Sequence, residues 1–75
     1  MLEDFIKENL IKTHDFITIP TKVVYDRYKL TQGKKGLSVL GKVSFYSDLE
    51  DLGIVRDKKS GKSNYRGWYL KPCKY

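Results

Sequence analysis

The sequence predicts a small α+β domain in which three short helices, with one short strand after the first, are followed by a C-terminal β-hairpin. Three observations lead to this prediction. The chain has 75 residues, too few for two domains. Three segments carry apolar residues at helical spacing, and two strand-like runs near the end are separated by a glycine turn. At this length the core is thin, so a deep enclosed active site is not expected.

The first helix is expected over about residues 2–12. Acidic residues occupy its first turn and Lys12 its last, as the helix dipole favours. The residues that share its apolar face, with one polar member, are Leu2, Phe5, Ile6, Asn9 and Leu10. After a break at 13–15, β-branched residues alternate through 16–19 and predict a very short strand, which Pro20 ends.

The second helix is expected over about residues 20–30. A capping threonine precedes Pro20, which suits a first turn because its missing N–H has no helical partner there. The apolar stripe of this helix consists of Val24, Tyr25 and Tyr28. The polar segment 31–36, marked by two glycines, predicts a loop.

The third helix is expected over about residues 42–52, and a start one turn earlier, with Ser38 as N-cap, stays open. Gly53 is expected to end it in the left-handed conformation. The residues on its buried face are Phe45, Leu49 and Leu52. The residues that point away from the core on a helical wheel are Val43, Ser47 and Glu50. The third helix therefore offers a surface to a partner.

Two runs, 54–58 and 64–70, flank a glycine turn at 59–62 and predict the β-hairpin. The even-numbered residues expected to share one side, with the last two facing the helices, are Asn64, Arg66, Trp68 and Leu70. A longer loop would change this register. The order of elements is that of a winged helix, in which the third helix can enter the major groove of DNA while the hairpin, the wing, runs along the phosphates.

The charge distribution agrees with DNA as a partner. Residues 1–55 are neutral, and the whole net charge of +6 lies in residues 56–75. A basic block on a protruding hairpin can neutralise several phosphates and release their counterions.

The expected DNA surface combines the start of the third helix with the hairpin. Its residues are Lys42, Ser44, Tyr46, Ser47, Arg56, Lys58, Lys59, Lys62, Asn64, Tyr65 and Arg66. Tyr65 could stack on an unpaired base or pack within the sheet. Asp48, Glu50 and Asp51 would repel phosphates, so the hairpin is expected to supply most of the affinity, with the helix N-terminus as an orienting contact.

The motifs of catalysis and of metal binding are incomplete. Cys73 is the only cysteine, which excludes an internal disulfide and a cysteine-based zinc cluster. Gly61-Lys62-Ser63 ends like a phosphate-binding loop, but the required earlier glycine is Arg56. His14 has no second histidine beside it. We therefore expect no cofactor, no metal and no enzymatic activity in this chain.

Membrane association is not expected either. No apolar run approaches eighteen residues, and the N-terminus is acidic at Glu3 and Asp4, where a secretory signal would be basic. A soluble, cytoplasmic, unprocessed protein is expected.

Several short motifs occur along the chain in the same order as in one protein family. They are Val24-Tyr25-x-x-Tyr28-Lys29, Phe45-x-x-x-Leu49-x-x-x-Gly53 and Tyr65-Arg66-Gly67 continuing to Leu70. Together they resemble the C-terminal domain of phage and plasmid primase-helicases of the superfamily 3 type, over nearly the whole chain. The family usually has several basic residues in the third helix, where this sequence has Glu50 and Asp51.

The resemblance implies a single winged-helix accessory domain, the C-terminal piece of a mobile-element replication protein in a bacterial host. Such a domain would bind origin-like or forked DNA beside a ring-shaped helicase, whose motor hydrolyses ATP. The isolated domain is expected to be a monomer. The positions that the resemblance assigns to DNA contact are Lys42, Ser44, Ser47, Arg56, Lys58, Lys59, Lys62 and Arg66.

Two alternatives stay open. One is a protein-interaction winged helix whose acidic third helix docks a partner subunit. The other is a free-standing small transcription regulator of the same fold, which would need a dimer and a palindromic site.

Overall fold

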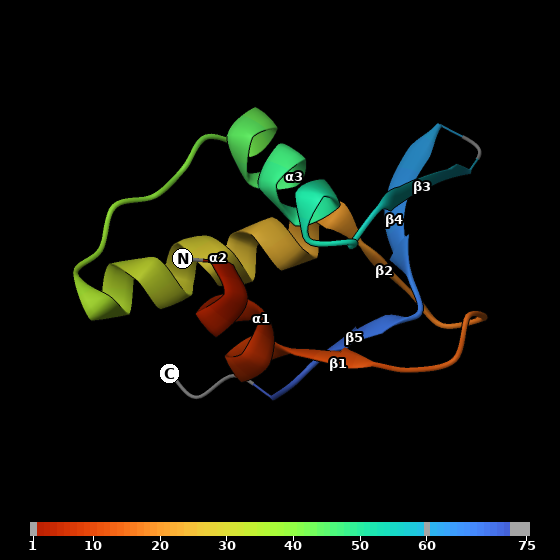
Figure 1. Ribbon diagram of the computed structural model, residues 1–75, viewed down its shortest axis with the longest axis horizontal. Coiled ribbons are helices and arrows are strands. Elements are labelled where there is room, and N and C mark those ends of the chain that lie inside the picture. Colours follow the sequence, from red (N-terminus) through yellow and green to blue (C-terminus); the bar gives the residue numbers. More distant parts are fainter. Residues whose placement is uncertain (1, 60, 73–75) are drawn as a thin grey trace.

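The structure is a computed structural model that describes residues 2–59 and 61–72, the side chain of Lys59 excepted. The described chain forms an α+β domain, as the sequence predicts (Figure 1). Its helices are α1 (Leu2–Asn9), α2 (Thr21–Lys35) and α3 (Lys42–Asp51). Its strands are β1 (Leu10–Lys12), β2 (Thr18–Pro20), β3 (Arg56–Lys59), β4 (Lys62–Arg66) and β5 (Trp68–Leu70). This order is compatible with a winged helix.

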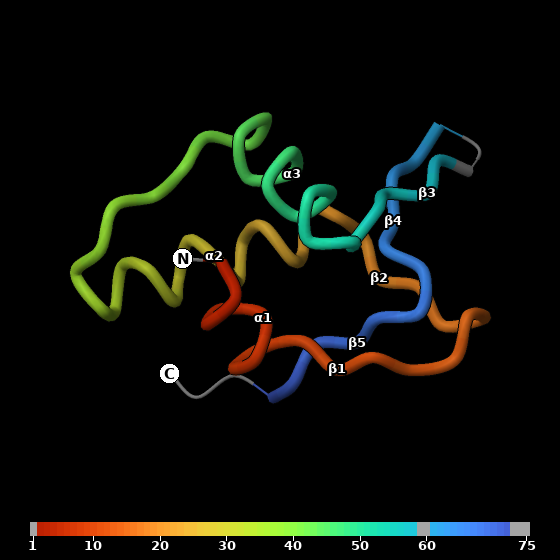
Figure 2. The backbone as a smooth tube through the Cα atoms, viewed as in Figure 1, coloured from red at the N-terminus to blue at the C-terminus, as the bar shows by residue number. Residues whose placement is uncertain are grey.

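The strands form two small antiparallel sheets. One pairs β1 with β5, and the other has the order β2-β4-β3. The chain continues from β4 directly into β5, so the last segment crosses from one sheet to the other (Figure 2). The helices lie together on one side, and the β3–β4 hairpin projects away from them (Figure 1).

The core lies where the three helices meet the sheets. Its centre is aromatic: the Tyr28 and Phe45 rings stack with centroids 4.5 Å apart, and Phe5 packs edge-on against both. The buried apolar residues are Leu2, Phe5, Leu10, Ile19, Val24, Tyr25, Tyr28, Phe45, Leu49, Ile54 and Tyr65. The hairpin strand β4 thus contributes Tyr65 to the same core that the helices share.

The first helix is shorter than the sequence predicts. It ends at Asn9, and Leu10–Lys12 form β1 instead of the last helical turn. Asn9 Nδ2 donates to the Phe5 carbonyl, and the Asn9 carbonyl accepts the Lys71 N–H. Pairing with β5 near the other end of the chain therefore overrides the local helical pattern.

The short strand lies at Thr18–Pro20, slightly later than the predicted 16–19. Pro20 is paired with Asn64 although it has no N–H. Strand β2 lies at an edge of its sheet, where a proline is tolerated because the missing donor faces no second strand.

The predicted loop at 31–36 is wrong for residues 31–35, since α2, expected to end near residue 30, continues to Lys35. Gly33 lies inside the helix, and Gly36, at φ 68°, ends it. The Gly36 N–H donates to the Gly33 carbonyl and the Leu37 N–H to that of Gln32, which closes the helix end. The composition of the segment suggested a loop because it is polar and rich in glycine.

Helix α3 begins at Lys42, without the earlier start at Ser38. Gly53 has φ 92° as predicted, and the Ile54 N–H donates to the Leu49 carbonyl across it. Phe45 and Leu49 are fully buried, but Leu52 is 42% exposed. Leu52 was predicted on the buried face; it lies at the C-cap, where the chain has already left the helical path.

Gly67 separates strand β4 from strand β5. Its φ of 79° is a conformation that side chains disfavour. Because of this interruption Tyr65 faces the core on one side of Gly67 and Trp68 packs against it on the other. The prediction that Asn64 and Arg66 share a side with Trp68 is therefore wrong.

Candidate nucleic-acid interface

The register of the β3–β4 hairpin divides its charged residues between two faces. Residues directly opposite each other in an antiparallel pair point to the same face. Arg56 pairs with Tyr65 and Lys58 with Ser63. Since Tyr65 is buried, these residues define an inner face, the one that turns toward the helices.

The other positions define an outer face. Here Asp57 pairs with Asn64, and Arg66 with Thr18 of β2. Lys62 is in register with Lys59, whose side chain lies outside the described residues. Arg66 Nη2 contacts Asp57 Oδ2 at 2.6 Å. The hairpin thus carries cations on both of its faces.

On the inner face Arg56 connects the hairpin to α3. Its Nε lies 3.4 Å from Glu50 Oε1, and its guanidinium lies 4.9 Å from the centre of the Tyr46 ring. Tyr46 also packs on Phe45 of the core. Both charged groups are partly exposed, so the pair stabilises the fold by less than about 1 kcal/mol. Tyr46, predicted as a DNA contact, is thus half-buried under Arg56.

Tyr65 does not belong to an accessible surface, which corrects one part of the predicted site. Its side chain has no exposed area, and its hydroxyl has no hydrogen-bond partner within the described residues. Burial, with a smaller contribution from nearby Tyr46, raises the pKa of the Tyr65 phenol well above its ordinary value. Of the two interpretations that the sequence left open, the structure shows packing.

The start of α3 is open to solvent. Lys42, Ser44 and Ser47 are exposed, and Val43 is 83% exposed. No acidic residue lies in the first turn, and the N-cap residue Gly41 supplies no side-chain hydrogen bond. The unpaired backbone N–H groups of this turn therefore carry a partial positive charge that suits an anion.

The acidic residues of α3 are placed away from this turn. Asp48 and Asp51 line a shallow hollow together with Leu2 and Glu3 of α1. Glu50 lies at the opposite side, against Arg56. The sequence predicted that these acidic residues repel phosphates. In the structure Asp48 and Asp51 lie toward α1, and the charge of Glu50 is partly offset by Arg56.

Beyond the predicted residues, the outer face ends in an exposed aromatic ring. Phe16, in the loop between β1 and β2, is 82% exposed and stacks on His14 with ring centroids 5.2 Å apart. An open hollow of about 600 Å³ lies beside it, lined by Asp15, Phe16, Thr18, Asp57, Asn64 and Arg66. Sequence reasoning assigned Phe16 to a strand; the turn residues before it were the signal that it lies in a loop.

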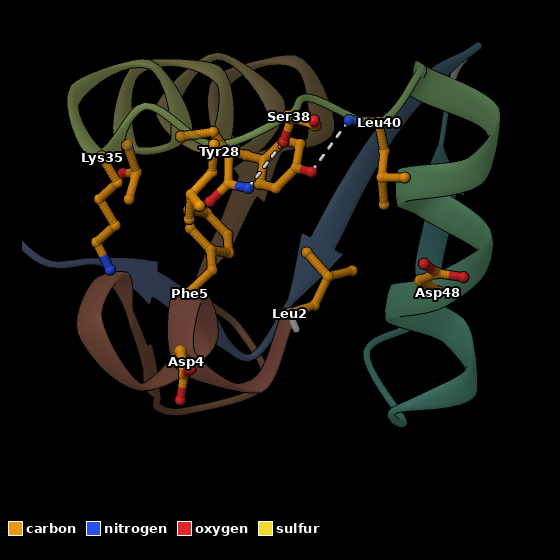
Figure 3. A pocket seen from close by; sticks show the side chains of 11 residues that line it. Leu2, Asp4, Phe5, Tyr28, Lys35, Ser38, Leu40 and Asp48 are labelled. Carbon is orange, nitrogen blue, oxygen red and sulfur yellow. Dashed lines mark hydrogen bonds between the residues drawn. The ribbon is translucent and has the colours of Figure 1, made fainter.

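A cleft of about 350 Å³ lies between α1, α2, the α2–α3 linker and α3 (Figure 3). Leu2, Phe5, Tyr28 and Leu40 form its apolar walls, and its charged lining residues are Asp4, Lys35 and Asp48. The Thr31 hydroxyl at its floor is buried and has no partner within the described residues. None of the residues predicted to contact DNA lines this cleft.

No protein-family model matches the chain, and no curated protein matches it. None of the helices in residues 2–59 and 61–72 is both long and apolar enough to cross a membrane.

Proposed function

We propose that the chain is a winged-helix domain that binds DNA, with the β3–β4 hairpin as its wing. One observation carries the proposal: the hairpin projects from the helices and holds Arg56 and Lys58 on its inner face and Lys62 and Arg66 on its outer face. The net charge of the chain lies in the segment that contains this hairpin.

The wing supplies most of the binding energy in this proposal. Flexible cations on a projecting hairpin can reach phosphates along the duplex, and each neutralised phosphate releases counterions. The first turn of α3 adds Lys42, Ser44 and Ser47, with backbone N–H groups that can hold one phosphate and fix the orientation of the domain. Base-specific recognition is limited, because Lys42 is the one basic residue of α3, whose second half carries Asp48, Glu50 and Asp51.

The biological setting that we propose rests on the resemblance of the sequence to the C-terminal domain of phage and plasmid primase-helicases. In that setting the domain is a non-catalytic accessory of a replication initiator. It brings origin-like or forked DNA to a helicase, and the ATPase belongs to the remainder of the parent protein.

A titration of labelled duplex, single-stranded and forked DNA tests the proposal, with fluorescence anisotropy at two salt concentrations. Binding is expected to weaken steeply with salt. The Lys58→Ala/Lys62→Ala variant should bind more weakly. The slope of its log affinity against log salt should become shallower by about 0.9 for each phosphate that the variant no longer neutralises.

The matched control is Lys7→Ala/Lys34→Ala, which removes the same charge from exposed positions of α1 and α2. It should change affinity less than the wing variant. Equal losses of affinity in the two variants would mean that DNA binding arises from general charge attraction and not from specific contacts of the wing. Absence of binding to all three DNAs at low salt would overturn the proposal.

The cleft in Figure 3 favours a protein partner as a second candidate. Its apolar walls suit a large apolar side chain, and the Asp48 carboxylate suits a basic residue beside it, while Lys35 also lines the cleft. Saturable binding of a Lys-Leu-Leu-Lys peptide that is abolished in Asp48→Lys but kept in Lys58→Ala/Lys62→Ala would support it. Binding unaffected by Asp48→Lys would exclude this cleft as the docking place.

A further inference from the structure

Phe16 is a large aromatic residue presented to solvent in a fixed position. Its loop is held by one residue from both ends: the Thr13 N–H donates to the Gly67 carbonyl at 2.8 Å, and the Gly67 N–H donates to the Ile17 carbonyl at 2.7 Å. The Ile17 N–H also donates to the His14 carbonyl. A ligand that contacts Phe16 would therefore bind at little entropic cost for ordering the loop.

His14 lies parallel to Phe16, with an angle of 5° between the two rings. The imidazole supports one side of the Phe16 ring, while 82% of the Phe16 residue stays exposed. An exposed phenyl ring loses the free energy of apolar burial unless something covers it. A flat ring with one supported side is shaped to stack against another flat ring.

The hollow beside Phe16 is polar. Besides Phe16, the residues that line it are Thr18, Asn64, Arg66, Asp15 and Asp57, and Arg66 and Asp57 form an ion pair with each other. These groups include both donors and acceptors, which the edge of a nucleobase requires. Lys62 and Arg66 on the same outer face can contact phosphates.

We propose that Phe16, supported by His14, stacks on an unpaired nucleobase, and that Asn64 and Arg66 contact the same nucleotide. This inference rests on the proposed function. Duplex DNA would lie against α3 and the inner face of the wing, and an unpaired strand would pass over the outer face. The wing then stands between the duplex and the displaced strand, so the favoured substrate is a junction of double-stranded and single-stranded DNA.

Replacement of Phe16 tests this assignment. Loss of one stacked base costs about 1–3 kcal/mol, so Phe16→Ala should weaken binding of forked and single-stranded DNA by about 5- to 150-fold. Duplex affinity should stay within about twofold. Phe16→Tyr keeps a stacking ring and should bind the fork as the natural chain does. Because Phe16 is exposed, both variants are expected to fold, which circular dichroism checks.

A fork with 2-aminopurine at the first unpaired position gives a direct signal. Its fluorescence should fall when the natural chain or Phe16→Tyr binds, and should not fall with Phe16→Ala. Normal duplex binding with an unchanged fork affinity in Phe16→Ala would overturn the stacking site and leave the wing proposal standing. An equal loss of affinity on duplex and fork would also overturn it, since stacking on an unpaired base cannot weaken the duplex complex. No binding of any DNA by the natural chain would overturn both.

Discussion

Arg56 of the wing and Glu50 of α3 form an ion pair, with Arg56 Nε 3.4 Å from Glu50 Oε1. The contact joins the first strand of the hairpin to the last turn of the helix. It also explains how an acidic residue is accommodated close to a basic block: the nearest cation offsets its charge. Part of the positive potential of the wing is thereby neutralised within the protein.

Glu50→Gln should strengthen DNA binding by about two- to fivefold at low salt, because Arg56 becomes available to a phosphate and one repelling charge is removed. The free energy of unfolding should change by less than about 1 kcal/mol, since both partners are partly exposed. Anisotropy titrations and urea unfolding measure the two effects. Glu3→Gln, an equal charge change on α1, is the control, and weaker binding by Glu50→Gln would contradict the expected role of Arg56.

Tyr65→Phe should leave the free energy of unfolding at pH 7 unchanged or raise it by about 1 kcal/mol, because it removes a buried hydroxyl without a partner within the described residues. DNA affinity should not change, since the side chain is inaccessible. Urea unfolding at neutral pH and the anisotropy titration check these points. A decrease of more than about 1 kcal/mol would mean that the hydroxyl makes a favourable interaction.

The same variant should alter the alkaline dependence of stability. The pKa of Tyr65 lies above its ordinary value of 10.0 in the folded chain, so the folded state holds the proton more tightly than the unfolded state. This contribution is fully present below pH 10 and is lost as the pH rises through the folded pKa. Between about pH 7 and pH 11 the natural chain should therefore lose more stability than Tyr65→Phe, while Tyr69→Phe, at an exposed position, should behave like the natural chain.

Two glycine replacements should have opposite effects. Gly33→Ala should stabilise the fold by about 0.5–1 kcal/mol, because Gly33 lies inside α2 with open space around it. Gly67→Ala should destabilise it by about 1–2 kcal/mol, because alanine disfavours a φ of 79° and its Cβ would lie 3.2 Å from Asp15 Oδ1. Thermal and urea unfolding measure both. A destabilising Gly33→Ala would contradict a helix that reaches Lys35.

Local signals predicted α3 almost to the residue. The spacing of Phe45 and Leu49 and the position of Gly53 are all set within one short segment, and the structure has the expected burial and the left-handed helix end. The buried stripe of α2 was predicted for the same reason. Strand β1 was not, because its partner β5 lies near the other end of the chain and no local pattern contains that information.

The candidate site likewise combines features that local sequence predicts with features that depend on contacts distant in sequence. The exposure of Ser47 follows from the helical wheel, which places it away from Phe45. The distribution of the hairpin residues between two faces depends on register, and Gly67 shifts that alternation beyond Tyr65. The support of the Phe16 ring by His14 depends on how the loop 13–17 closes onto Gly67, a contact distant in sequence.

The backbone of one residue in the α2–α3 linker, Leu40, is held by two side chains of α2. The Tyr25 hydroxyl donates to the Leu40 carbonyl at 2.8 Å, and the Leu40 N–H donates to the Tyr28 hydroxyl at 3.1 Å. The Leu40 amide should thus exchange its hydrogen slowly, although the linker around it is exposed. The exchange rate of this amide, measured with and without a ligand, therefore reports whether α3 keeps its position on α2 when the ligand binds.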